Sequence, residues 1–134
     1  MRDMERRFRM LWMAALAAAV TSISQPAHAA ELIMFEQKGC EWCEVWDEKI
    51  APVYPKTAEG ERAPLRRVDI HDPAPTDIAH IRSGAFTPTF VLVDDGREIG
   101  RIRGYPGEDF FWGMLQELIE KLPDEVAGRD VDPY

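Results

Sequence analysis

Residues 31–43 read ELIMFEQKGCEWC and contain both cysteines of the chain. The stretch opens with a short apolar run between two glutamates, which predicts a buried strand over 31–36. Cys40 and Cys43 follow, at the point where the apolar residues change to helical spacing. The stretch therefore predicts a strand, a turn at Gly39 and a helix that begins at the first cysteine.

The position of the two cysteines has a chemical consequence. A sulfur at the start of a helix lies near free backbone N–H groups and the positive end of the helix dipole, which favour the thiolate over the thiol. The second sulfur, one turn later, can attack a mixed disulfide formed on the first. We therefore expect Cys40 to be the exposed nucleophile and Cys43 the resolving thiol. The charges of Lys38 and Glu41 should modulate the pair, with opposite signs.

Three interpretations of the pair remain open on this reasoning. A purely structural disulfide across so short a loop contributes roughly 2 kcal/mol, less than the roughly 3 kcal/mol expected for a 15-residue loop. A metal site needs two more ligands, and His71 and His80 do not cluster with the cysteines in the sequence. A redox dithiol fits a Cys-x-x-Cys at a strand-to-helix turn best. We expect it to need no metal and no other cofactor.

The N-terminal residues have the layout of a secretory signal. A basic start precedes an apolar run over 11–20, and Ala27-His28-Ala29 places small residues on either side of a larger one. An uncleaved membrane anchor is the alternative, but the run is about half of the 20 residues that span a bilayer. We expect a signal peptide over 1–29, cleaved near Ala29, and a periplasmic protein without stable membrane insertion.

Length and charge limit the remaining possibilities. The 134 residues suit one domain, and 16 Lys and Arg against 24 Asp and Glu give a net charge of −8. This acidic balance argues against nucleic acid as a partner, because nucleic acid is bound by a basic face. Two cysteines exclude a disulfide-rich scaffold. We expect a monomer with one domain over 30–123 and a flexible acidic tail over 124–134.

The chain after the cysteines alternates between strand and helix patterns. The expected elements are a first helix that Pro52 shortens, a loop over 57–64, strands over 65–70, 89–93 and 98–103, a short helix over 76–83, an Asp-Gly hairpin turn over 94–97 and a last helix over 108–122. This order, β-α-β-α-β-β-α, predicts an α/β fold, a four-stranded mixed sheet with helices on both faces.

Helical spacing also selects candidate core residues. The candidates are Trp42, Val45, Trp46, Ile50 and Val53 on the first helix, Ile78 and Ile81 on the second, and Phe111, Leu115, Leu118 and Leu122 on the last, with Phe110, Trp112, Met114 and Ile119 beside them. Trp42 is ambiguous, because it lies inside the cysteine motif and could face a partner instead.

Thr87-Pro88 stands directly before the β-prone run over 89–93. Proline cannot donate to a sheet ladder, so the first position of a strand suits it. Taken alone, such a peptide bond is expected to be trans, since only about 5–6% of X–Pro bonds are cis.

The cysteine motif, the Thr-Pro that precedes the third strand, the hairpin and the final helix together resemble the thioredoxin family over 31–122. The resemblance implies a thioredoxin-like fold, a cis bond before Pro88 and a position for Pro88 beside the redox pair. It also implies that the backbone of Thr87 pairs with an extended partner strand, with Trp42 as a further contact.

The chain departs from cytosolic thioredoxins at three places. Gly39 precedes the first cysteine, and Glu41-Trp42 replaces the usual Gly-Pro between the two. Met34 stands where the family usually buries an acid, so a base that assists Cys43 is not evident. Arg67 matches a family lysine near that acid, but without the carboxylate its role is unsupported.

The exported context and Lys38-Gly39-Cys-x-x-Cys are more similar to small periplasmic thioredoxins, in particular the regulatory thioredoxins of bacterial sulfur-oxidising (Sox) systems. That resemblance implies a reductase of protein disulfides that keeps the Sox sulfur-carrier protein active, with a membrane thiol transporter as electron donor. The alternatives are a periplasmic oxidant of folding proteins, or a redox-inert binding module such as a metal chaperone.

Overall fold

The computed structural model describes residues 30–123. The expected signal peptide over 1–29 and acidic tail over 124–134 lie outside the described residues. The elements are β1 (Glu31–Glu36), α2 (Glu41–Lys49), the 3₁₀ turn η1 (Tyr54–Lys56), α3 (Ala58–Arg62), β2 (Leu65–Asp69), the 3₁₀ turn η2 (Thr76–Ile78), β3 (Thr89–Asp94), β4 (Arg97–Arg103) and α4 (Glu108–Ile119).

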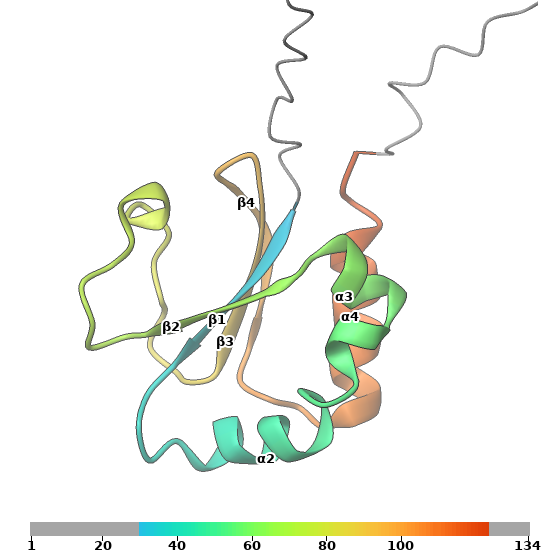
Figure 1. Ribbon diagram of the computed structural model, residues 1–134, viewed down its shortest axis with the longest axis horizontal. Coiled ribbons are helices and arrows are strands. Elements are labelled where there is room, and N and C mark those ends of the chain that lie inside the picture. Colours follow the sequence, from blue (N-terminus) through green and yellow to red (C-terminus); the bar gives the residue numbers. More distant parts are fainter. Residues whose placement is uncertain (1–29, 124–134) are drawn as a thin grey trace, which may run out of the picture.

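The sheet has the order β2-β1-β3-β4, with β1 and β2 parallel and the other pairs antiparallel (Figure 1). In the register, Phe35 of β1 lies opposite Val68 of β2 and Thr89 of β3. Asp95 and Gly96 have φ values of 50° and 70°, which form the tight turn between β3 and β4. The expected four-stranded mixed α/β sheet is confirmed.

The helices α2, α3 and α4 all lie toward one face of the sheet (Figure 1). Trp46 of α2 is the centre of this core, with its ring 5.2 Å from that of Phe90, 5.8 Å from that of Phe111 and 6.2 Å from that of Tyr54. All four residues are fully or almost fully buried. The packing of these rings around Trp46 thus holds α2, the helix that carries the cysteines, against the sheet.

The opposite face has a thinner cover. Its core residues Val91 and Val93 lie under Ile78 and Ile81, which come from the segment between β2 and β3. The helix expected over 76–83 is wrong, because only the single turn η2 forms there. Pro73 and Pro75 favour an extended conformation in the residues before them. The segment after Pro75 is too short for a stable α-helix. The expectation of helices on both faces is therefore corrected: α2, α3 and α4 cover one face, and the 3₁₀ turn η2 is the only helical turn on the other face within residues 30–123.

The loop expected over 57–64 is also wrong, because residues 58–62 form α3. Thr57 caps this helix, since its hydroxyl accepts a hydrogen bond from the Gly60 N–H at 3.1 Å. A Cβ atom on Gly60 would lie 1.9 Å from the carbonyl oxygen of Tyr54. Gly60 therefore allows α3 to pack closely against the preceding turn η1.

The expected helix faces are confirmed at their centres and wrong at their margins. The buried candidates are Trp46, Ile50, Ile78, Ile81, Phe111, Leu115, Leu118 and Leu122, whereas Trp42, Val53, Phe110 and Met114 are exposed, and Val45, Trp112 and Ile119 are intermediate. Each helix contacts the sheet over a narrow stripe, so a neighbour about 100° round the helix falls outside it. Within residues 30–123, no helix combines the length and apolarity needed to cross a membrane.

Candidate functional site

A turn between β1 and α2 positions the first cysteine. The Cys40 N–H donates to the carbonyl oxygen of Gln37 at 3.3 Å. Gly39 has a φ of +76°, a left-handed conformation that favours glycine. Cys40 itself has extended backbone and occupies the N-cap of α2. The glycine thus allows the chain to reverse and to present a sulfur at the helix start.

The cysteines form a disulfide with a Cα–Cα distance of 5.2 Å. The Cys40 Sγ also accepts a hydrogen bond at 3.2 Å from the Cys43 N–H in the first turn of α2, which the Cys40 carbonyl oxygen shares at 3.1 Å. The same N–H group and the helix dipole would stabilise negative charge on this sulfur when the disulfide is reduced. The arrangement is suited to thiolate chemistry at Cys40.

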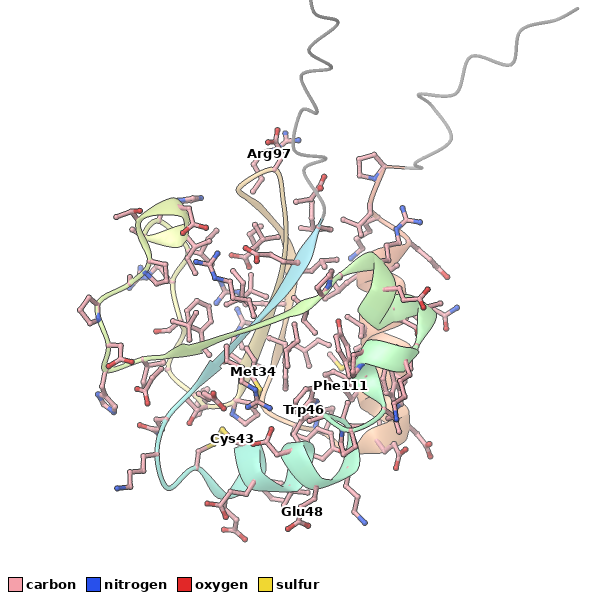
Figure 2. All side chains as sticks on the ribbon, in the orientation of Figure 1. Met34, Cys43, Trp46, Glu48, Arg97 and Phe111 are labelled. Atoms are coloured by element: carbon pink, nitrogen blue, oxygen red, sulfur yellow. A yellow bond between two sulfur atoms is a disulfide. The ribbon has the colours of Figure 1, made fainter. Side chains whose placement is uncertain are left out.

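Neither sulfur is freely exposed. Cys40 is 8% exposed and Cys43 is 4% exposed, so the expectation of an exposed nucleophile is wrong in degree. Both belong to the core cluster that contains Met34 and Trp46, and Figure 2 shows Cys43, Met34 and Trp46 between α2 and the sheet. The N-cap position draws Cys40 inward because its sulfur bonds to the helix backbone. Only a small part of the Cys40 surface is therefore accessible to another molecule.

A second loop, the proline loop with Thr87 and Pro88, approaches the cysteine turn (residues 37–40) from the start of β3. The Thr87–Pro88 peptide bond is cis, as the thioredoxin resemblance implies, and Pro88 is buried. The Pro88 carbonyl oxygen accepts a hydrogen bond from the Gly104 N–H at 2.7 Å, which ties the loop to the end of β4. The Gln37 side-chain amide donates to the Thr87 hydroxyl at 3.0 Å. This last bond joins the loop to the cysteine turn.

Gln37 is a site residue that the sequence analysis missed. Its amide nitrogen reaches Thr87, and its amide oxygen lies 3.1 Å from the Nε2 atom of His71. The Asp69 carboxylate accepts a hydrogen bond from the His71 N–H at 2.9 Å, so it shapes the turn after β2. Gln37 thus links three loops at one edge of the sheet. Its position between a predicted strand and the cysteine motif was the only available signal.

Two aromatic side chains near the cysteines project into solvent, one from the start of α2 and one from the loop before β3. Trp42 is 57% exposed, which favours a partner-facing role over packing on the helix start. Phe86, next to Thr87, is 67% exposed and was not singled out from the sequence. Lys38 and Glu41 are exposed, and neither forms an ion pair within residues 30–123. They can change the local potential without fixing the geometry.

Arg67 has carboxylate partners that the sequence analysis did not foresee. It lies 2.7 Å from Glu36 and 2.5 Å from Asp47, and its guanidinium carbon lies 5.6 Å from the centre of the Trp46 ring. Partial burial opposes its charge, but the hydrogen bonds and charges of Asp47 and Glu36 outweigh this and raise the pKa of Arg67. Arg67, on β2, therefore links the end of β1 to α2. Met34, at the position where thioredoxins usually bury an acid, is itself fully buried.

His80, the other histidine of residues 30–123, lies away from the cysteines. The Nε2 atom of His80 is 2.6 Å from the carbonyl oxygen of Gly96, at the β3–β4 turn. Within residues 30–123, no group of three or more His, Cys, Asp or Glu residues is arranged to hold a metal ion. The described cysteine pair therefore has no further ligands gathered around it.

Solved structures of thioredoxins are similar to this chain. The periplasmic thioredoxin SoxS from Paracoccus pantotrophus, in its reduced form, is 51% identical, with a TM-score of 0.64 over 69% of this chain and 97% of that chain. The mitochondrial thioredoxin 3 of Saccharomyces cerevisiae is 24% identical, with a TM-score of 0.51 over 72% of this chain and 81% of its own. A thioredoxin from Thermus thermophilus is 18% identical, with a TM-score of 0.58 over 84% and 89%. These last two support the fold alone.

No protein-family model matches the chain, and no curated protein matches it. The similarity to SoxS nevertheless extends over almost the whole of that protein, with about half of the aligned residues identical. It agrees with the Cys-x-x-Cys disulfide at the start of α2 and with the four-stranded sheet. The chain belongs to the thioredoxin family and is a thiol–disulfide oxidoreductase.

Proposed function

We propose that the chain is a periplasmic reductase of protein disulfides, with Cys40 as the attacking sulfur and Cys43 as the resolving sulfur. The observation that carries this assignment is the hydrogen bond from the Cys43 N–H to the Cys40 Sγ. This bond supports Cys40 as the sulfur that the start of α2 stabilises, and the deeper burial of Cys43 supports its resolving role.

The exchange balances as two successive displacements. In the reduced protein, the Cys40 thiolate attacks one sulfur of the partner's disulfide, and the other partner sulfur leaves as a thiolate. Cys43, after loss of its proton to solvent or a nearby base, attacks the Cys40 sulfur and releases the second partner thiolate. Two electrons pass to the partner, and the Cys40–Cys43 disulfide remains. A dithiol donor must then reduce this disulfide by the same exchange.

The proline loop is the proposed binding platform. The Thr87 backbone, next to the cis bond, would pair with an extended segment of the partner. Trp42 would contact the partner from the other side of the cysteines, because most of its side chain is exposed. Large flat aromatic rings give contact area at little cost in conformational entropy. Lys38 and Glu41 would adjust the charge at this surface.

The similarity to SoxS supports a more specific role. We assign the Sox sulfur-carrier protein as the partner, with the chain reducing disulfides that inactivate it. A membrane thiol transporter would supply the electrons through its own dithiol. Trapping tests this pairing: Cys43→Ser should accumulate a mixed disulfide between Cys40 and the carrier protein, whereas Cys40→Ser should not. Absence of that adduct from cells that make both proteins would exclude the carrier as partner.

The direction of electron flow has its own test. The reduction potential of the Cys40–Cys43 pair is measured by equilibration in dithiothreitol or glutathione buffers. A value near about −270 mV supports the reductase, and a value near about −120 mV would identify an oxidant of folding proteins instead. The surface around Cys40 serves either direction, so the potential decides between them.

The periplasmic location rests on the similarity to a periplasmic thioredoxin and on the sequence of residues 1–29. N-terminal sequencing of the protein recovered from the periplasm should begin at Ala30. A chain that begins at Met1 and stays with the membrane fraction would contradict cleavage near Ala29.

A further inference from the structure

An open cavity of about 900 Å³ lies on the face of the sheet opposite the helices. Its residues come from the segment before the proline loop and from β4, and they are His80, Arg82, Ser83, Gly84, Ala85, Glu98, Arg101 and Arg103. The cavity exists because the chain over 79–85 forms no helix that would cover this part of β4. It is separate from the cysteine pair, and none of the roles proposed above uses it.

The lining is basic, although the whole chain carries a net charge of −8. Glu98 is the only carboxylate that lines the cavity. Arg101 neutralises it through bonds of 2.5 and 2.6 Å and also donates to the Arg82 carbonyl oxygen at 3.1 Å. The exposed side chains of Arg82 and Arg103 form no ion pair within residues 30–123, although the charge of Arg103 helps to lower the pKa of Glu98. Two positive charges therefore remain available to an anionic ligand.

The cavity adjoins the proline loop on both of its walls. The segment that contains Arg82 runs through the exposed Phe86 to Thr87. On the other wall, Arg103 lies opposite Thr89, the residue that follows Pro88. Neighbouring strands are about 4.8 Å apart, and an extended chain advances about 3.3 Å per residue. A peptide that crosses Pro88 can thus reach Arg103 or Arg82 within a few residues.

We propose that this cavity binds an acidic segment of the partner protein, located within a few residues of the disulfide that the partner presents to Cys40. Carboxylates of that segment would pair with Arg82 and Arg103. The inference rests on the proposed function and adds to it a charge preference. Contacts at solvent-exposed arginines are weak for a free anion. They become effective for a segment that the cysteine exchange already holds nearby.

The test compares three substrates of the full chain after prior reduction. Two peptides carry the same disulfide-bonded cysteines and differ only in three flanking residues, all Asp in one and all Lys in the other. Bis(2-hydroxyethyl) disulfide serves as a small uncharged substrate that does not reach the cavity. The variants are Arg82→Glu/Arg103→Glu, the milder Arg82→Gln/Arg103→Gln, and the control Arg97→Glu. Figure 2 shows Arg97 at the opposite end of the sheet from Cys43.

The natural chain should reduce the Asp peptide about tenfold faster than the Lys peptide at low salt, with the difference shrinking in about 0.5 M salt. The glutamine variant should abolish this preference, and the glutamate variant should reverse it. Both should keep the rate with bis(2-hydroxyethyl) disulfide within about twofold, as should the control, which should also retain the preference.

Equal rates with the two peptides in the natural chain would overturn the proposal, as would a preference that survives both double variants. Binding of sulfate to the cavity without any preference between the peptides would also overturn it, since the cavity would then be a site for free anions. Failure of the natural chain to reduce even bis(2-hydroxyethyl) disulfide would instead contradict the proposed reductase. The two failures are therefore distinguishable.

Discussion

The two faces of the sheet are built in different ways. On the helix-covered face, Trp46, Phe90 and Phe111 pack ring against ring in one core that also encloses the cysteines. On the opposite face, an irregular segment with one 3₁₀ turn covers a smaller set of apolar side chains and leaves a charged cavity beside β4. The first face fixes the position of the reactive groups, whereas the second leaves surface available for recognition.

This division follows from packing physics. A rigid, close-packed core holds α2 and its N-terminus in place, so the hydrogen bond to the Cys40 sulfur is maintained without help from a ligand. A segment without regular secondary structure tolerates charged side chains, because its backbone and its arginines remain in contact with water. Four predictions, in order of decreasing effect, would break or sharpen the contrast.

The largest effect should come from the helix-covered face. Cys40→Ser should abolish turnover with any disulfide substrate, because a hydroxyl does not replace the thiolate nucleophile. Reduction of insulin by the variant, followed by turbidity, is the measurement. The thermal transition of reduced Cys40→Ser should match that of the reduced natural chain. Residual catalysis above background would place the nucleophile elsewhere.

Matched truncations should separate the two cores by stability. Leu115→Ala on the helix-covered face should destabilise the protein by about 4–5 kcal/mol, and Ile78→Ala on the other face by about 2–3 kcal/mol. Both side chains are buried, but the segment around Ile78 can collapse into the space, whereas α4 is held by its neighbours. Urea unfolding gives both values. Equal losses would show that the irregular segment is packed as rigidly as the helices.

Gln37 links the cysteine turn to the loop before β3, and its effect should be intermediate. Gln37→Ala should lower kcat/KM with a peptide disulfide by about fivefold, since one hydrogen bond of about 1 kcal/mol holds the proline loop. The rate with bis(2-hydroxyethyl) disulfide should not change. Thr87→Val removes the other partner, so the double variant should be no worse than either single one. Additive losses would exclude this bond as the cause.

The smallest effect should be a pH-dependent change in stability on the face opposite the helices. The hydrogen bond from Arg101 holds the pKa of Glu98 below its ordinary value. Such a group stabilises the fold at pH values above its unfolded pKa of about 4.3, and this contribution is lost as the pH falls through the lower folded pKa. Glu98→Gln should therefore cost at most about 1 kcal/mol at pH 7. The difference from the natural chain should shrink below about pH 4 in denaturant titrations.

Much of the architecture was predictable because its signals are local. The apolar run of β1, the Asp-Gly turn at 94–97 and the Leu115 and Leu118 stripe of α4 each correspond to an element in the structure. The loop expected over 57–64 was wrong because these polar residues form a short helix, α3, in which Gly60 makes close contact with Tyr54. Contacts of this kind depend on residues that the local pattern does not identify.

The candidate site was predictable only in part. Cys40, Cys43 and Thr87-Pro88 are short motifs that can be found by spacing, and the structure brings their two loops together through Gln37. The depth of the cysteines in the core and the pairing of Arg67 with Glu36 and Asp47 join separate elements. No spacing rule contains such contacts, because they arise only when the sheet and α2 are assembled.

The sequence by itself determined the order of the strands along the chain, the helix that starts at Cys40 and the chemistry of a dithiol, since these depend on residue type and near neighbours. Only the tertiary structure decided which face each segment covers and how deeply the sulfurs lie. It also decided that Arg82 and Arg103 line the same open cavity. The physical reason is that burial and charge proximity depend on distances between segments, which local propensities do not fix.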